Sequence, residues 1–396
     1  NPRFVDAHFY LGLAHHANHD LQLAKAELTE ALNLAPGLYK ARLPLATIYL
    51  LSNDYSLALE EVQKVLHKFP DHPGANLIAG DVKLYMKKPE EAALHFRKLI
   101  SVSPNDPRGY AKLGMTYQMQ KKVKKAMEQY EKALLINPNL IDVLGMITSF
   151  HILNKEPDKA IARVKSQLKG SPENPLLHHF LGKVYEVTGD MERAETSIKK
   201  SINIDSKRVG PYVDLGRLYQ KRGTLDEAIN HYREASRIKP EILPPYVLLG
   251  MIYEQQGKID EATEQYKKAL DINPKFAPAA NNLAWIYAEH GGNIDVALSL
   301  AEAAKEQFPD DPSISDTLGW IYYKKKVYLK AISLFRMSLE KLPDNPVLHY
   351  HLGMAYYKKG DRDAAGEKLN TALKLSSDFN GADEAREALK DLKESD

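Results

Sequence analysis

An alanine returns every 34 residues along most of this chain. It occupies eight positions with that step, from Ala24 to Ala262, and three more after one slipped residue, at Ala297, Ala331 and Ala365. A fixed step of this length is typical of units that cannot bury their own apolar face and stack on their neighbours instead. The 396 residues therefore predict one array with a core running along it, rather than two or three globular domains.

Each unit contains two segments with the periodicity of a helix, and residues 209–242 show this most fully. The first segment carries small and aromatic residues along one face, at Tyr212, Leu215, Gly216 and Tyr219. The second segment repeats the spacing at Ala228, Tyr232 and Ala235. Steps of three and four residues define one face of an α-helix, so the unit is predicted to be a helix hairpin.

The turn of this hairpin is predicted at residues 222–224. Gly223 can adopt a left-handed backbone, Thr224 is expected to cap the second helix, and Pro240 is expected to end that helix. A glycine on the first helix and the periodic alanine on the second let the two helices approach closely, and an aromatic side chain fills the adjoining space. Replacing Ala228 by Leu should overpack this junction, at a cost of about 1–3 kcal/mol.

With the alanine in all eleven units and a helix-ending proline in nine, residues 5–379 resemble the tetratricopeptide repeat (TPR) family. The resemblance implies an all-α, right-handed superhelical solenoid, in which the first helix of each hairpin lines a concave surface and the second lies on the convex side. Residues 380–396 are expected to form a charged C-terminal capping helix, and residues 1–4 are expected to be the tail of a missing upstream repeat. The eleven expected repeats are 5–38, 39–72, 73–106, 107–140, 141–174, 175–208, 209–242, 243–276, 277–311, 312–345 and 346–379.

Departures from the pattern concentrate in the middle of the array. The fifth repeat has Thr148, His151 and Gln167 where small or aromatic residues are usual, and the sixth has Ser206 in place of the proline. This stretch is therefore predicted to be the least well packed.

Two further departures affect single elements. The ninth repeat gains one residue near Gly291–Gly292, where an insertion lengthens only a turn. Pro44 falls inside the first helix of the second repeat and is expected to kink it.

Composition and motifs exclude several classes of function. The 54 Lys and Arg against 52 Asp and Glu are too balanced to favour nucleic acid or an anionic membrane. No apolar run approaches the roughly 18–20 residues that span a bilayer, and the absence of Cys excludes disulfides and thiolate metal sites. His15 and His19 beside Asp20 have the spacing of a metal pair, but no third ligand is evident and a solvated helix end explains them. We therefore expect no catalytic residue, no cofactor and no metal.

Function must then come from the expected concave surface. Both tryptophans occupy equivalent positions there in adjacent repeats, and aromatic, polar and methionine side chains are expected around them as an exposed strip. The alternative is that the indoles pack against the next helix. The candidate groove residues are Trp285, Trp320, Tyr323, Tyr350, Tyr357, Asn281, Asp316, Met251 and Met354.

Two secondary surfaces are also predicted. Lys183, Arg217 and Lys221 would form a basic inner patch, which could hold an acidic ligand or be a solvated face. An apolar group near the N-terminus could bind a ligand or serve as the seam to upstream repeats, and it consists of Leu50, Leu51, Leu84 and Tyr85.

These features favour a non-enzymatic scaffold that binds a protein or peptide in its groove, with self-association through the N-terminal end as a further expectation. The alternative is a carbohydrate-binding arm of a bacterial exopolysaccharide synthesis or export complex. Residues 281–287 and 316–320, followed by Asp344–Pro346, resemble the closing repeats of bacterial envelope proteins of exopolysaccharide or PEP-CTERM-type sorting systems. That resemblance implies the periplasm or cell envelope, with the cytoplasm as the alternative.

Overall fold

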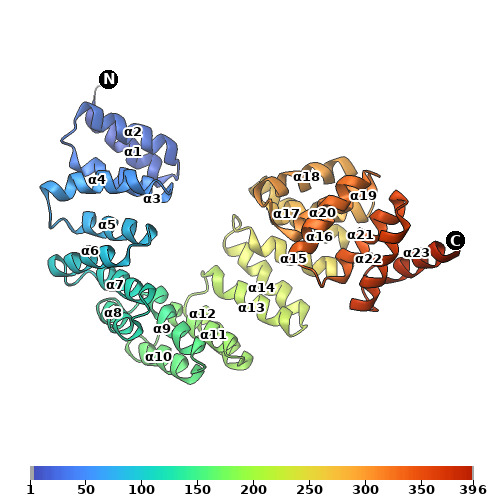
Figure 1. The fold of residues 1–396 in the computed structure, drawn as a ribbon. Helices are drawn as coiled ribbons and strands as arrows, with labels where there is room; N and C mark the ends of the chain where they lie inside the picture. Colours follow the sequence, from blue (N-terminus) through green and yellow to red (C-terminus); the bar gives the residue numbers. More distant parts are fainter. Residues whose placement is uncertain (1–3, 395–396) are drawn as a thin grey trace. The chain divides into compact units, whose positions relative to one another are not determined.

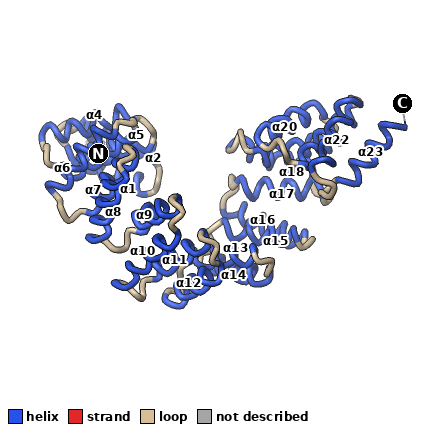
Figure 2. Tube along the Cα trace, turned by 60° about the horizontal axis from the view of Figure 1, so that its bottom comes forward, coloured by secondary structure: helices blue, strands red, loops and turns tan. Residues whose placement is uncertain are grey.

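The computed structural model describes residues 4–394, which form 23 helices and no strand (Figure 2). The chain divides into two compact units, the first ending at Asp205 and the second starting at Ser206. Within each unit, successive helices lie side by side as hairpins (Figure 1). The predicted all-α hairpin fold is confirmed.

The first unit contains twelve helices: α1 (Val5–Ala17), α2 (Leu21–Leu34), α3 (Tyr39–Leu51), α4 (Tyr55–Lys68), α5 (Pro73–Tyr85), α6 (Pro89–Val102), α7 (Pro107–Met119), α8 (Val123–Ile136), α9 (Ile141–Leu153), α10 (Pro157–Gly170), α11 (Pro175–Val187) and α12 (Met191–Ile204). The second unit contains eleven: α13 (Val209–Lys221), α14 (Leu225–Ile238), α15 (Pro244–Gln255), α16 (Ile259–Ile272), α17 (Ala277–Glu289), α18 (Ile294–Gln307), α19 (Pro312–Lys324), α20 (Tyr328–Lys341), α21 (Pro346–Lys359), α22 (Arg362–Leu375) and α23 (Ala382–Glu394).

The hairpins close through contacts between glycines of the first helix and large side chains of the second. A methyl group added at Gly319 would lie 2.7 Å from Cε1 of Phe335, and one at Gly114 would lie 2.5 Å from Cε1 of Tyr130. Both distances are too short for carbon atoms, so only glycine fits. The periodic alanines are likewise fully buried or nearly so. The predicted packing of small against aromatic residues is confirmed.

The turns agree with the sequence in backbone but not in capping. Gly223 has φ of 79°, in the left-handed region, as expected. The Thr224 hydroxyl does not cap α14 as predicted, because it donates to the Tyr219 carbonyl oxygen at 3.2 Å. The extra residue of the ninth repeat lies in the turn between α17 and α18, where the insertion was expected. Pro44 lies inside α3, as the sequence indicated, and the helix continues through it to Leu51; the kink expected there stays a prediction.

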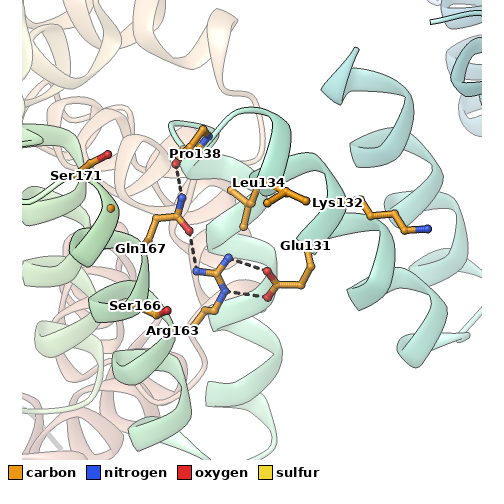
Figure 3. A pocket seen from close by; sticks show the side chains of 10 residues that line it. Glu131, Lys132, Leu134, Pro138, Arg163, Ser166, Gln167 and Ser171 are labelled. Carbon is orange, nitrogen blue, oxygen red and sulfur yellow. Dashed lines mark hydrogen bonds and ion pairs between the residues drawn. The ribbon is translucent and has the colours of Figure 1, made fainter. Parts of the chain in front are cut away.

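The fourth and fifth hairpins leave a cavity between their second helices. A cavity of about 560 Å³ lies between α8 and α10, and Figure 3 shows Arg163 at its centre. The Arg163 guanidinium donates to both carboxylate oxygens of Glu131 at 2.8 Å and to Gln167 Oε1 at 2.8 Å. Gln167 Nε2 in turn donates to the Pro138 carbonyl oxygen at 3.1 Å. Gln167, which replaces the usual alanine, therefore belongs to a polar network between neighbouring hairpins.

The last helix, α23, covers the end of the second unit. It buries Ala382, Ala385, Ala388 and Leu392, and three of these join the cluster that contains Trp320 and Tyr350. A helix thus lies within residues 380–396, where a cap was expected, and its remaining residues are mostly exposed and charged. At the other end, residues 1–3 of the expected upstream tail lie outside the described residues.

Candidate binding site

The tryptophans lie on α17 and α19, the first helices of two successive hairpins in the second unit. Their rings are 6.4 Å apart, and Trp320 stacks on Tyr323 at 4.7 Å and on His351 at 4.2 Å between ring centroids. Tyr350 lies 6.1 Å from Trp320. Since His351 and Tyr350 come from α21, three consecutive first helices contribute to one aromatic cluster.

A carboxylate that sequence reasoning did not single out fixes the indole of Trp320. Its Nε1 donates to Glu289, and Lys324 Nζ lies 2.9 Å from the same carboxylate. Burial alone would raise the pKa of Glu289, but the hydrogen bonds from Trp320 and Lys324 and the positive charge of Lys324 outweigh it and lower the pKa below its ordinary value. Glu289 is therefore ionised at neutral pH. Lys324 stands four residues after Trp320 on the same helix, which was the available signal for it. Glu289 comes from the preceding hairpin, and no spacing in the sequence indicated its contact with Trp320.

A second polar pair lies beneath the cluster. His351 is 3% exposed, and its Nδ1 is 2.7 Å from Asp316 Oδ1. Because the ring of His351 stacks against Trp320, this pair holds α21 against α19 at the level of the indole. Asp316 was predicted as a groove residue, and His351 was not.

The tyrosines of the cluster differ in environment. Burial raises the pKa of Tyr323 to about 12, and it also raises the pKa of Tyr350, so both hydroxyls stay protonated at neutral pH. Tyr357 donates from its hydroxyl to Asp391 on α23 at 2.5 Å, which raises its pKa as well. The capping helix thus reaches the edge of the cluster.

The expected exposed strip is only partly present. Four of its side chains are buried, Trp320 at 6%, Tyr350 at 7%, Met354 at 9% and Asn281 at 9% exposure, and the first three belong to one apolar cluster. The alternative that an indole packs against the next helix therefore holds for Trp320. Side chains that keep accessible surface are Trp285, Tyr323, Tyr357 and Asp316, all partly exposed, and Met251, which is exposed.

The three basic residues of the predicted inner patch are all exposed. Lys183 lies on α11 in the first unit, and Arg217 and Lys221 lie on α13 in the second. Arg217 forms an ion pair with Asp214, one turn earlier on α13. Its charge is therefore partly neutralised within its own helix.

Within residues 4–394, no group of three or more His, Asp or Glu side chains is placed to hold a metal ion. None of the helices in this part of the chain has both the length and the apolar character needed to cross a membrane. His15 and Asp20, considered above as part of a metal pair, lie 3.7 Å apart as a simple pair at the end of α1.

Four family models, each described as tetratricopeptide repeat, match stretches that together cover more than half of the chain. The stretches are 15–79, 107–140, 177–208, 209–242, 245–276, 265–295 and 347–379. The chain belongs to the tetratricopeptide repeat family. Matches to this TPR protein extend into both units and include the α17 segment that carries Trp285.

Solved structures resemble the TPR protein at low identity. The Cut9–Hcn1 hetero-tetramer of APC/C matches with 14% identity over 98% of this chain and 96% of that chain, at a TM-score of 0.49. Yeast Tom70 matches with 17% identity over 99% of this chain and 96% of that chain, at a TM-score of 0.41. A tetratricopeptide repeat protein from Parabacteroides merdae matches with 19% identity over 64% of this chain and 98% of that chain, at a TM-score of 0.45. No curated protein matches significantly.

Proposed function

We propose that this TPR protein is a non-enzymatic scaffold that holds a protein or peptide against the inner face of its second unit. The anchor consists of the accessible edges of Trp285, Tyr323 and Tyr357, with Lys324 beside them. Buried Trp320 and His351, with partly buried Glu289, act as the rigid base that keeps these edges in place. The family supports protein partners in general, and the choice of site is our inference.

The observation that carries this proposal is the stacking of Tyr323 on an indole that is itself fixed by a hydrogen bond and a second stack. Aromatic side chains that are already immobilised lose little conformational entropy when a partner covers them. Partly exposed Trp and Tyr are also the residue types enriched among binding hot spots. Lys324, 5.2 Å above the Trp320 ring and paired with Glu289, adds a polar rim.

The test uses Trp285→Ala and Tyr323→Ala in the full chain, because replacing buried Trp320 would cost about 3–5 kcal/mol of stability and confuse the result. Partners that co-purify from cells of the native host are identified by mass spectrometry for the parent and the variants. We expect each substitution to weaken binding of the main partner by roughly 2 kcal/mol, as for a hot spot. The control is Phe308→Ala, which truncates an aromatic side chain that is 51% exposed away from the cluster.

Recovery of the same partners by parent and variants, with unchanged circular dichroism, would refute the anchor. The carbohydrate alternative is examined in the same proteins by titrating oligosaccharides while following tryptophan fluorescence. Quenching that is lost in Trp285→Ala would replace the peptide proposal by the carbohydrate one, because sugar rings stack on exposed aromatic faces.

A further inference from the structure

A row of exposed apolar side chains runs along the first unit, away from the aromatic cluster. Five consecutive first helices, α3, α5, α7, α9 and α11, each end in an apolar residue. Their exposed fractions lie between 51% and 83%. This apolar row consists of Leu51, Tyr85, Met119, Leu153 and Val187. Only its first two members were noticed in the sequence, as a group with Leu50 and Leu84.

The fold does not require apolar residues at these positions. The first helices of the second unit place polar residues at the equivalent step of the repeat, and these are Lys221, Gln255, Glu289, Lys324 and Lys358. Side chains that are more than half exposed also contribute little to the core. The apolar row is therefore unexplained by folding, and a run of exposed apolar residues marks an interaction surface.

Lysines accompany the middle of this row. Lys87, Lys121 and Lys155 each follow a row residue by two positions and are exposed. Each has φ near 60°, a conformation that glycine adopts more readily and that glycine supplies in several turns of the second unit. Lys124 and Lys125 stand after the same turn as Lys121, and none of these five has an ion-pair partner within residues 4–394. The row is thus flanked by unpaired positive charge.

A cavity opens beside the fourth member of the row. It has a volume of about 470 Å³, lies between α8, α9 and α11, and its wall includes Met127, Met146, Phe150, Leu153 and Phe180. It exists because α9 carries Gly145 there, and a methyl group added at Gly145 would meet nothing nearer than Phe180 at 3.9 Å. An apolar cavity of about 150 Å³ already accepts benzene. A bulky apolar side chain therefore fits.

We propose that this face of the first unit binds an acidic amphipathic segment of a partner protein. One bulky apolar residue of the segment occupies the cavity at Leu153, further apolar residues cover Met119 and Tyr85, and Asp or Glu residues meet the lysines. This site is separate from the aromatic cluster of the second unit. The two can be tested independently.

An anionic membrane shares part of this chemistry, since it also offers apolar and negatively charged groups. The cavity favours a protein segment, because a single side chain anchored in a pocket is the usual centre of a peptide interface. The row also presents one apolar residue per hairpin at a regular interval, which suits a polypeptide segment with regularly spaced apolar side chains better than a membrane.

The experiment selects binders to the full chain from a phage-displayed library of random peptides. We expect the enriched peptides to combine bulky apolar residues with Asp and Glu, and to bind with a dissociation constant that rises steeply with salt. Enrichment of basic or purely polar peptides, or no enrichment, would overturn the proposal.

The selected peptide is then titrated against variants of the surface. Leu153→Ser and Lys121→Glu should each weaken binding about tenfold, as expected for a loss at a hot spot. Leu329→Ser and Lys374→Glu are the matched controls, because both are exposed residues of the second unit. Equal binding by the row variants and the controls would contradict the assignment of the surface.

Filling the cavity separates this site from a general effect on folding. Gly145→Leu places a side chain in the cavity and removes a glycine from a helix, so stability should not fall, while peptide binding should drop about tenfold. Vesicles of phosphatidylcholine with phosphatidylserine are tested in parallel by sedimentation. Vesicle binding that is lost in Leu153→Ser, without any peptide binding, would show that the row meets a membrane instead.

Discussion

Single side chains set the distance between the helices of each hairpin. The glycine of the first helix faces a large side chain of the second, as Gly319 faces Phe335. This pairing was predictable, because glycine, alanine and the aromatic residue all return at one period. The contact is local within a hairpin, so its geometry is the same wherever the pattern is intact.

Replacing a glycine at such a contact should lower the free energy of unfolding, whereas replacing a glycine outside these contacts should not. Gly319→Ala puts a methyl group 2.7 Å from Cε1 of the fully buried Phe335, and we expect a loss of about 1–3 kcal/mol. Gly366→Ala on α22 meets nothing within 4 Å and should stabilise the chain by up to about 1 kcal/mol. Urea denaturation followed by circular dichroism measures both. A similar effect of the two changes would show that helix propensity, rather than the close contact, determines the change in stability.

The burial of Trp320 shows where sequence reasoning stops. The period gives the face on which Trp320 lies, and it does not give the direction in which the indole turns along that face. Here the hydrogen bond to Glu289 and the stack on His351 draw the ring beneath Tyr350 and α21. Those partners come from neighbouring hairpins at unrelated steps, so no repeat pattern predicted them.

Among the helices, α23 has the clearest individual role. It begins after Gly381, whose φ of 101° lies in the range that favours glycine. A methyl group added at Gly381 would lie closer to Cε1 of Tyr350 than two carbon atoms can approach. Gly381→Ala should therefore strain the backbone and push on Tyr350 together, at a cost of about 2–4 kcal/mol. The expected result is a lower melting temperature and faster amide hydrogen exchange in α23.

Gly360→Ala is the matched control, since Gly360 also has positive φ, at 88°, but a methyl group there meets nothing within 4 Å. It should lower the free energy of unfolding only by the cost of a positive φ in a non-glycine residue, about 1–2 kcal/mol. Equal losses in the two variants would mean that the contact with Tyr350 contributes nothing to docking of the cap.

Helix boundaries were predictable and helix packing only in part. Turn glycines and prolines mark the ends of the hairpins, and the structure places helices between them. The loosened fifth hairpin was anticipated from Thr148 and Gln167, but the cavities beside it were not. Their size depends on Gly145 and on the Gln167 network with Arg163, which involve residues of adjacent hairpins.

For the complete chain, the period predicted an array of hairpins. It did not predict how many consecutive hairpins unfold together as one cooperative unit. The structure divides it after Asp205, next to Ser206, which replaces the usual proline. In a repeat protein each hairpin is stabilised by its nearest neighbours. Each unit has apolar clusters of its own, such as the one around Phe9 and Leu28 in the first and the one around Phe335 and Leu369 in the second.

We therefore expect fragments 1–205 and 206–396 to fold separately. Each should show a helical circular dichroism spectrum and a cooperative urea transition, with an m-value in proportion to its length. A fragment that starts at Leu225 is the control, because it keeps α14 but removes α13, against which Ala228 and Tyr232 are buried. Exposing that apolar face should lower the stability of the shorter fragment by several kcal/mol, at roughly 25 cal/mol per Å². If 206–396 were as unstable as 225–396, the boundary at Asp205 would have no energetic meaning and the hairpins would cooperate across it.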